Sequence, residues 1–369
     1  MKKILFLIPN LSVGGAEKVL VNLVNNMDKS KFDITVQVLF AGGVNEMFLK
    51  EHIKLKHCFK RTFRGNIHFF KLFSPEFLYK WFIKEHYDIV VSYLEGPTAR
   101  IVSGCPDEDT KLVSWVHIQQ YSKERASHSF RNFSEAKTCY EKFDKIICVS
   151  KSVKIDFENI FDLNNNIEVL YNTNETAEIL QLATVKYDLK FGDEATNICV
   201  VGKLLKNKGV DRVLRIHRKL LLDGFNTHLY YLGTGPEQEN IISYAKENGI
   251  SDKVTLLGYQ TNPYKYVKAC DLFVCASLAE GFSTAATEAL IVGTPVITVE
   301  VSGMKEMLGE NNEYGIVTEN SEEALYEGIK KMLSTPGMLQ DYAKRAEERG
   351  SYFSTDNTVK SVQDMLCSL

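Results

Sequence analysis

The sequence predicts an α/β protein built from two doubly wound parallel sheets. Short apolar runs alternate with amphipathic stretches along the whole chain, as they do in parallel strands joined by covering helices. The chain has 369 residues, more than one hydrophobic core usually serves, so we expect two domains. Its content of 44% hydrophobic and 25% charged residues is ordinary for a globular enzyme.

Apolar runs of strand length occur in both halves of the chain. The expected strands of the first half are residues 3–9, 32–39, 89–93, 111–117, 145–150 and 167–171. Those of the second half are residues 197–202, 228–233, 253–257, 271–276 and 295–299. Amphipathic stretches such as residues 16–27 and 209–222 lie between these runs and are expected to form helices.

The domain boundary is expected between residues 172 and 192. Residues 172–175, Asn-Thr-Asn-Glu, form a turn-prone polar end to the strand at 167–171, and a fresh strand opens after residue 194. We therefore expect a first domain at residues 1–175 and a second at residues 176–351.

Composition excludes several classes of protein. The net charge of −3 argues against bulk binding of nucleic acid. The eight cysteines show no C-x-x-C spacing, and Cys148, Cys199 and Cys275 fall in apolar runs. This pattern predicts buried free thiols in a reducing compartment, not a disulfide scaffold or a zinc site.

The N-terminal apolar run is expected to be a strand. Pro9 and Asn10 end it where a signal peptide would continue. No apolar stretch approaches the roughly 18–20 residues that a spanning helix needs. We expect a cytoplasmic protein, or one bound peripherally at the cytosolic face of a membrane.

A strand–turn–helix unit near residue 280 is the most informative local pattern. The apolar run at 271–276 predicts a buried strand that stops shortly before Glu280. Gly281 permits a tight turn, and Ser283 can cap a helix over residues 284–292. The Gly-Thr-Pro sequence that follows ends this helix.

Two glutamates, Glu280 and Glu288, lie in this unit. A helix start with unpaired N–H groups attracts anions. Glu280 stands just before that start, and Glu288 lies roughly one and a half turns further on. Their carboxylates can accept hydrogen bonds from different hydroxyls of one polyhydroxylated ligand. The alternative is a pair of solvated glutamates beside a surface helix.

This unit resembles the Glu-x7-Glu signature of retaining glycosyltransferases with the two-Rossmann-domain GT-B architecture, above all those of family 4. The resemblance implies that Glu280, with Gly281, Phe282 and Ser283, holds the donor sugar and that Glu288 holds the ribose of the nucleotide. It also implies that the two domains face each other across a cleft and that the final helix, about residues 352–369, packs back on the first domain.

The turn after the first expected strand contains Gly14 and Gly15. Ligands in open α/β sheets bind beyond the carboxyl ends of the strands, and a glycine pair lets the backbone approach a ligand closely. The turn has neither the G-x-G-x-x-G pattern nor the lysine of a Walker A loop. The resemblance implies that Gly14 and Gly15 face the donor diphosphate and the acceptor; otherwise they form only a tight turn.

The second half opens with a strand that ends at Gly202, followed by Lys203 and Lys208. A departing diphosphate needs fixed positive charge when no metal supplies it. The family usually has arginine at the position of Lys203, so this chain keeps the charge without the planar fork of arginine. The resemblance implies that Lys203 and Lys208 bind the diphosphate; the alternative is a solvated lysine-rich loop.

Four further residues follow strand ends. By resemblance, Gly258 and Tyr259 belong to the segment that contacts the nucleobase, and His117 lies beside the transferred sugar. His117 could equally be a core or rim histidine. Glu95, after the strand at 89–93, is a candidate contact for the acceptor.

The expected chemistry uses no metal and no cofactor. No acidic pair of the D-x-D type follows a strand, and no His/Cys cluster has metal-ligand spacing. The resemblance implies front-face substitution with retention of configuration. His117, Lys203, Lys208 and Glu280 are the expected catalytic residues, with the lysines stabilising the departing diphosphate.

Residues 54–84 mix basic and large aromatic side chains, with one acid, Glu76. Such a mixture suits an anionic membrane surface. Burial of the rings in the core of the first domain is the equal alternative, and binding of single-stranded nucleic acid is disfavoured.

The resulting hypothesis is a glycosyltransferase that moves a hexosyl or N-acetylhexosaminyl group. Its expected donor is a nucleotide-sugar, with UDP as the expected nucleotide, and its expected acceptor is a glycan or polyprenyl-linked glycan of a bacterial surface polysaccharide such as a capsule. A sugar-nucleotide 2-epimerase of the same architecture and a non-catalytic glycan- or lipid-binding protein are the alternatives. A Rossmann oxidoreductase is disfavoured because the dinucleotide glycine pattern is missing.

Overall fold

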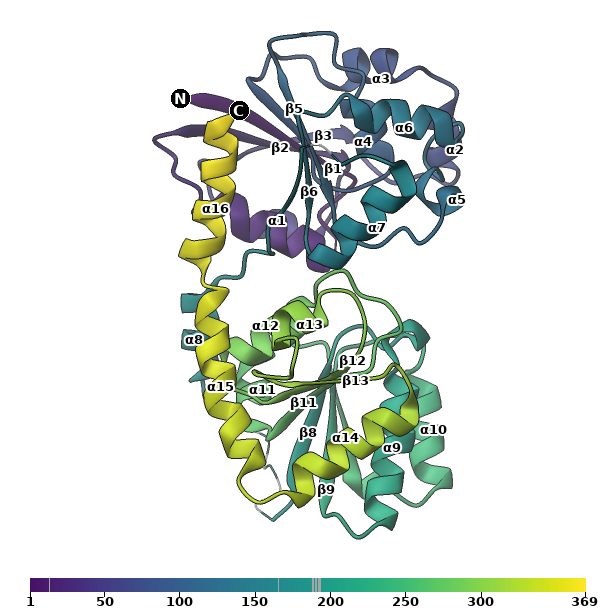
Figure 1. Cartoon of the computed structure of the whole chain (residues 1–369), viewed down its shortest axis with the longest axis vertical. Coiled ribbons are helices and arrows are strands. Elements are labelled where there is room, and N and C mark those ends of the chain that lie inside the picture. The colour runs from purple at the N-terminus through teal and green to yellow at the C-terminus, as the bar shows by residue number, and fades with distance from the viewer. Residues whose placement is uncertain (13, 165, 188, 190, 192–193) are drawn as a thin grey trace. The chain divides into compact units, whose positions relative to one another are not determined.

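The computed structural model describes residues 1–12, 14–164, 166–187, 189, 191 and 194–369. The chain forms two compact units, each with its own sheet (Figure 1). The first unit contains Met1–Asn174 and Thr355–Leu369, and the second contains Glu175–Ser354. All the strand pairs in the described residues are parallel, which confirms the predicted fold class.

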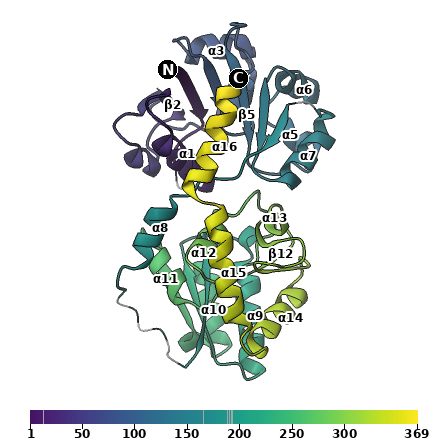
Figure 2. The ribbon, with the colours of Figure 1, turned by 60° about the vertical axis from the view of Figure 1, so that its left-hand side comes forward.

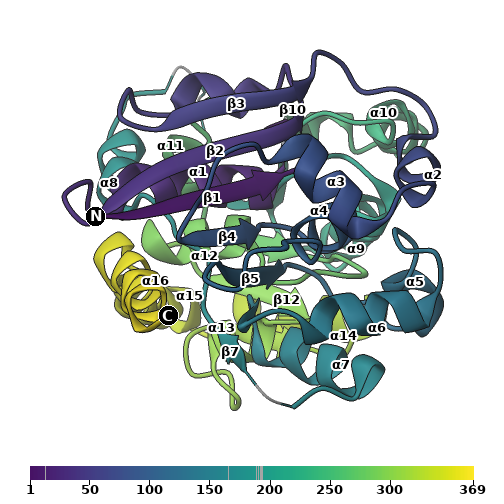
Figure 3. The ribbon, with the colours of Figure 1, turned by 90° about the horizontal axis from the view of Figure 1, so that it is seen from above.

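The sheet of the first unit has the strand order β3-β2-β1-β4-β5-β6-β7 among the described residues. Its strands are β1 Lys2–Ile8, β2 Phe32–Phe40, β3 Lys54–Phe59, β4 Ile89–Ser92, β5 Lys111–Val116, β6 Lys145–Cys148 and β7 Ile167–Val169. Figure 3 shows β3, β2, β1, β4 and β5 side by side. The order reverses between β1 and β4, and ligands of open parallel sheets bind beyond the carboxyl ends at such a point.

Helices cover both faces of this sheet (Figures 1 and 2). One face carries α1 Gly15–Asn26 and the final helix, α16 Thr355–Ser368. The other carries α3 Pro75–Phe82, α4 Pro97–Val102, α6 Phe133–Glu141 and α7 Lys151–Phe161. Shorter helices are η1 Val44–Phe48, α2 Asn66–Lys71 and α5 Lys123–Ala126. Lys2 Nζ donates to the carbonyl of Leu366 at 3.0 Å, which ties α16 to the first strand.

The sheet of the second unit has the order β10-β9-β8-β11-β12-β13 among the described residues. Its strands are β8 Thr196–Val201, β9 Thr227–Leu232, β10 Val254–Gly258, β11 Leu272–Cys275, β12 Val296–Val299 and β13 Ile316–Thr318. The order reverses between β8 and β11, so the loops after these two strands meet at the switch point.

The second sheet is also covered on both faces (Figure 1). One face carries α9 Val210–Leu222, α10 Gln238–Glu247 and α14 Glu322–Ser334; the other carries α8 Thr176–Ala183, α11 Tyr264–Ala269, α12 Thr284–Ile291 and α15 Met338–Tyr352. Shorter helices are η2 Lys206–Lys208, η3 Ser251–Lys253 and α13 Met304–Leu308. Each central strand is therefore buried on both sides, which explains why these strands read as continuous apolar runs.

The sequence analysis missed two strands, β3 and β13. β3 lies at the edge of its sheet, and polar residues alternate along it because one side faces solvent. β13 has only three residues. The strand predicted at 253–257 begins at Val254 in the structure, one residue later than predicted, since Lys253 ends η3.

The polar segment before the second unit, predicted to be a turn-prone end to the preceding strand, is buried. Asn172, Thr173 and Asn174 are at most 6% exposed. Asn22 Nδ2 donates to the carbonyl of Thr173, and Thr355 Oγ1 donates to that of Asn174. These hydrogen bonds satisfy the buried backbone and make the burial tolerable.

The aromatic stretch forms a cluster of touching rings beside β3. Phe59, Phe63, Phe69, Phe73 and Trp81 lie within 6.4 Å of one another in successive centroid contacts. Phe70 and Phe82 are buried, as the core interpretation expects. Leu72, Phe77 and Trp81 remain 73%, 51% and 38% exposed.

No helix within the described residues has both the length and the apolar character required to cross a bilayer.

Candidate active site

Three glycines line the carboxyl ends of adjacent strands in the second unit. Gly202 follows β8, Gly233 follows β9 and Gly258 ends β10, with φ values of 147°, 148° and 67°. The N–H of Gly233 donates to the carbonyl of Gly258 at 2.8 Å. A Cβ at Gly233 would lie 1.9 Å from the carbonyl oxygen of Gly202, so only glycine fits there. This edge exposes backbone to which a ligand can come close.

The lysine loop docks on the segment that follows β11. Gly209 has φ 65°, and a Cβ on it would lie 2.1 Å from the carbonyl oxygen of Ala276. The N–H of Leu278 donates to the carbonyl of Asn207 at 2.8 Å. Close packing of these two loops at the switch point brings Lys208 to the predicted donor-sugar loop.

Lys208 and Glu280 form an ion pair. Lys208 Nζ lies 2.7 Å from Glu280 Oε1, and Ser277 Oγ donates to the same oxygen at 2.6 Å. The Glu280 side chain is 12% exposed and that of Lys208 34%. The side chain of Lys203 is exposed and makes no ion pair with any described residue. The structure thus joins two of the predicted catalytic residues directly.

Hydrogen bonds and a packed aromatic ring fix the loop before α12. Ser283 Oγ accepts from the N–H of Ala286 at 3.4 Å, which confirms its predicted capping role. Ser302 Oγ donates to the carbonyl of Gly281 at 3.0 Å. The ring of Phe282 is buried, 5.6 Å from the ring of Phe353. Phe282 therefore serves packing, and its backbone is the part that can meet a ligand.

Glu288 is buried on α12. Its residue exposure is 8%, and its Oε1 accepts from the hydroxyl of Tyr264 at 3.3 Å. The alternative of two solvated glutamates is therefore wrong, because Glu280 is also largely buried. Tyr259, by contrast, is 62% exposed beside Gly258.

Gly14 and Gly15 begin α1 in the first unit. Gly14 is the N-cap residue in an extended conformation, and Gly15 is the first helical residue. A Cβ at Gly14 would lie 2.1 Å from Glu17 Oε2, so glycine lets this carboxylate fold against the turn. Val13, which precedes the pair in the sequence, lies outside the described residues.

His117 and Glu95 meet at the carboxyl ends of β5 and β4. The N–H of His117 donates to Glu95 Oε2 at 2.9 Å. Burial lowers the pKa of His117 to about 3, so its imidazole is neutral at physiological pH. Its buried Nε2 has no hydrogen-bond partner within the described part of the chain. Burial raises the pKa of Glu95, while the His117 N–H and the nearby Arg125 oppose that rise. A buried polar atom without a partner marks a position where a ligand atom can bind.

The predicted site residues therefore form two groups, one in each unit. The second unit joins Lys208 to Glu280 and places Gly202 and Gly258 on one sheet edge. The first unit joins His117 to Glu95. The sequence analysis did not identify Ser277, Tyr264, Ser302 and Gly233 as site residues. Only Ser277, directly after an apolar run, carried a local signal.

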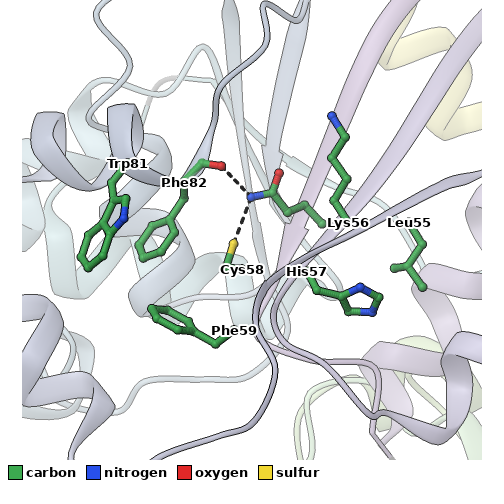
Figure 4. A pocket seen from close by; sticks show the side chains of 8 residues that line it. Leu55, Lys56, His57, Cys58, Phe59, Trp81 and Phe82 are labelled. Carbon is green, nitrogen blue, oxygen red and sulfur yellow. Dashed lines mark hydrogen bonds between the residues drawn. The ribbon is translucent and has the colours of Figure 1, made fainter.

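A separate pocket of about 450 Å³ lies at the β3 edge of the first sheet (Figure 4). Gln37 Nε2 donates there to the carbonyl of Phe82 at 2.9 Å and to Cys58 Sγ at 3.0 Å. Burial raises the pKa of the Cys58 thiol. None of the predicted site residues lines this pocket.

Known proteins match both halves of the chain. Residues 13–177 match the family model described as Glycosyltransferase Family 4, and residues 184–349 match the model described as Glycosyl transferases group 1. The Campylobacter jejuni N-acetylgalactosamine-N,N'-diacetylbacillosaminyl-diphospho-undecaprenol 4-alpha-N-acetylgalactosaminyltransferase is 28% identical over 377 residues and covers 99% of each chain. LpsD of Rhizobium meliloti, a lipopolysaccharide core biosynthesis glycosyltransferase, is 24% identical over 201 residues, covering 54% of this chain and 57% of LpsD.

Solved structures resemble the whole chain. HepE from Anabaena in complex with UDP has a TM-score of 0.77 at 17% identity and covers 100% of both chains. The lipopolysaccharide outer core galactosyltransferase WaaB, in its apo form, has a TM-score of 0.74 at 19% identity and covers 99% of both chains. The fold is therefore GT-B. Because glycosyltransferase models match both halves, the chain is a GT-B glycosyltransferase.

Proposed function

We propose that this protein is a retaining glycosyltransferase of bacterial surface glycan synthesis. It would transfer a hexosyl or N-acetylhexosaminyl group from a UDP-sugar to a hydroxyl of a polyprenyl-linked glycan. The observation that carries the proposal is the Lys208–Glu280 pair, held at the switch point of the second sheet and next to the start of α12.

The relatives support the donor and acceptor classes. The HepE structure contains UDP, and the name of the Campylobacter enzyme specifies a diphospho-undecaprenol-linked acceptor and an N-acetylgalactosaminyl group. The charges of this chain fit such a donor, since Lys203 and Lys208 follow β8 on the same sheet edge as Gly202, Gly233 and Gly258. Fixed ammonium groups stabilise a departing diphosphate without help from a metal.

We propose a separate role for each side chain of this pair. A diphosphate carries more negative charge than one carboxylate, so we expect Lys208 to move from Glu280 to the phosphates when the donor binds. Glu280, still oriented by Ser277, would then accept from a hydroxyl of the sugar. Glu288, oriented by Tyr264, would accept from the ribose hydroxyls.

The proposed reaction is a front-face substitution. The bond from the anomeric carbon to the diphosphate oxygen breaks, and the acceptor oxygen bonds to that carbon on the same face. The acceptor proton passes to the departing phosphate, so no protein base is required. The neutral imidazole of His117 would accept from, or donate to, a sugar hydroxyl through Nε2.

The test is transfer from a panel of UDP-sugars to a polyprenyl diphosphate-linked N-acetylhexosamine, followed by UDP release and mass spectrometry. Lys208→Ala should lower kcat/KM about 10²–10³-fold, as expected for loss of one transition-state charge contact. Lys206→Ala is the matched control, because Lys206 is exposed on the same short helix, and it should stay within about twofold of wild type.

Two outcomes would contradict the proposal. Equal activity of Lys208→Ala and Lys206→Ala would show that the Lys208–Glu280 pair has no special role in sugar transfer. Formation of a 2-epimerised sugar without transfer to any acceptor would show that the protein is the alternative 2-epimerase and not a transferase.

We further propose that residues 54–84 bind an anionic membrane at its cytosolic face. Leu72, Phe77 and Trp81 supply exposed apolar side chains, and Lys60, Arg61 and Arg64 supply exposed cations in the same segment. Such a surface would keep the enzyme close to a lipid-linked acceptor.

Sedimentation with phosphatidylglycerol vesicles tests the membrane proposal. Replacing Lys60, Arg61 and Arg64 by Gln should weaken binding roughly 100-fold, from about 1 kcal/mol per cation. The control carries the same charge change at exposed lysines elsewhere, Lys29, Lys246 and Lys268. Equal sedimentation of the two triple variants would refute the assignment of this segment.

A further inference from the structure

The loop after β5 is held in a backbone conformation that is uncommon for its sequence. Tyr121 has φ 61°, a left-handed value that is unfavourable for a bulky non-glycine residue. Asp156 on α7 fixes this shape: its Oδ2 accepts from the N–H of Gln120 at 2.6 Å, and its Oδ1 accepts from that of Tyr121 at 3.2 Å. Strained residues held by their surroundings cluster at binding sites.

Tyr121 follows His117 by four residues in the loop after β5, and Arg125 packs on its ring. Its side chain is 53% exposed, and the guanidinium carbon of Arg125 lies 5.4 Å from its ring centroid. Arg125 is close enough to Glu95 for its charge to oppose the raised pKa of that carboxyl. Glu95 in turn accepts from the backbone of His117. Arg125 therefore packs on the ring of Tyr121, its charge acts on Glu95, and Glu95 is hydrogen-bonded to His117.

The chemistry of this group favours a neutral polyhydroxylated ligand. One guanidinium is balanced by one carboxylate, and the imidazole is uncharged, so the group offers no net positive charge to a phosphate. Its hydrogen-bonding groups suit hydroxyls, and the buried Nε2 of His117 has no partner among the residues that the structure describes. A pyranose also has an apolar C–H face, which an aromatic ring with a negative face attracts.

We propose that Tyr121 is the stacking platform for the terminal pyranose of the acceptor, with Arg125 and Glu95 binding its hydroxyls. Tyr121 is then a specificity-determining residue, and Asp156 is the positioning residue that sets its backbone. This inference rests on the proposed function, since it identifies the sugar-binding part of the acceptor site.

The experiment separates loss of the ring from loss of the loop conformation. Tyr121→Asn removes the ring and keeps a residue that tolerates the left-handed conformation, and Tyr121→Phe keeps the ring. Saturation-transfer NMR would measure binding of three probes: methyl α-D-glucopyranoside, methyl α-D-galactopyranoside and methyl N-acetyl-α-D-galactosaminide. UDP-induced thermal stabilisation of each variant reports the integrity of donor binding.

We expect at least one probe to bind wild-type protein, Tyr121→Asn to weaken it about tenfold, and Tyr121→Phe to stay within twofold. UDP stabilisation should be the same in all three proteins. Unchanged probe binding in Tyr121→Asn, or no binding of any probe to wild type, would overturn the platform while leaving the transferase proposal in place. Failure of UDP to stabilise wild-type protein would instead remove the transferase proposal, and this inference with it.

Discussion

A buried arginine holds the aromatic cluster of residues 54–84 against the rest of the first unit. The Arg100 side chain is 1% exposed and forms a bidentate pair with Glu135, at 3.1 Å from Nε and 2.9 Å from Nη2. Nη1 and Nη2 also donate to the carbonyls of Phe70 and Phe73 respectively, each at 2.8 Å. The Arg100 side chain therefore provides hydrogen-bond donors to carbonyl groups at and just after the end of α2, and it neutralises the mostly buried carboxylate of Glu135.

Replacing Arg100 by Met should destabilise the first unit by about 3–5 kcal/mol, because Glu135 would keep a buried charge without its main partner. The two carbonyls would also lose their donors. At about 2–4 °C per kcal/mol for a unit of this size, the melting temperature should fall by roughly 6–20 °C.

Tryptophan fluorescence during urea unfolding measures this effect in the correct unit, because Trp81 and Trp115 both belong to the first unit and are the two tryptophans of the chain. Arg131→Met is the matched control. Arg131 donates to the neighbouring carbonyl of Lys71 and lies near the same Glu135, yet its side chain is 46% exposed. We expect it to cost about 1 kcal/mol or less.

Equal losses for the two variants would refute the reasoning, since burial is what distinguishes them. The double variant Arg100→Met with Glu135→Gln gives a second check. It should recover part of the loss, because the uncompensated charge is removed.

Two further predictions concern the second unit. Gly233→Ala should abolish UDP-induced stabilisation and lower the free energy of unfolding, because its Cβ would overlap the carbonyl of Gly202. The control is Gly224→Ala, where φ is 86° and the Cβ would meet open space, so only backbone strain of about 1 kcal/mol is expected. Thermal unfolding followed by circular dichroism measures both losses. Burial lowers the pKa of His217 to about 4. Between pH 6.5 and 4, His217 is therefore protonated in the unfolded chain but neutral in the folded unit. The contribution of neutral His217 to the free energy of unfolding should be fully present above pH 6.5 and fall by about 3 kcal/mol as the pH drops to 4. His217→Leu should flatten this dependence of the unfolding free energy on pH. Identical pH profiles for wild type and variant would exclude His217 as the cause.

The parallel sheets and the strand–turn–helix unit at Glu280 were open to prediction because their causes are local. A strand buried on both faces must be apolar throughout, and a capped helix must carry Ser283 at its start and glycine after its end. β3 was not predicted, because an edge strand exposes one side and its polar residues interrupt the apolar run by which buried strands are recognised.

The ion pair of Lys208 with Glu280 could be decided only by the tertiary structure, because the partners are 72 residues apart. Their meeting depends on how closely the Gly209 turn packs against Ala276, which no single segment encodes. The same holds for Tyr121, whose backbone is set by a carboxylate on α7. Local sequence determined which segments are buried and how each one turns, whereas packing between distant loops decided which side chains share a site.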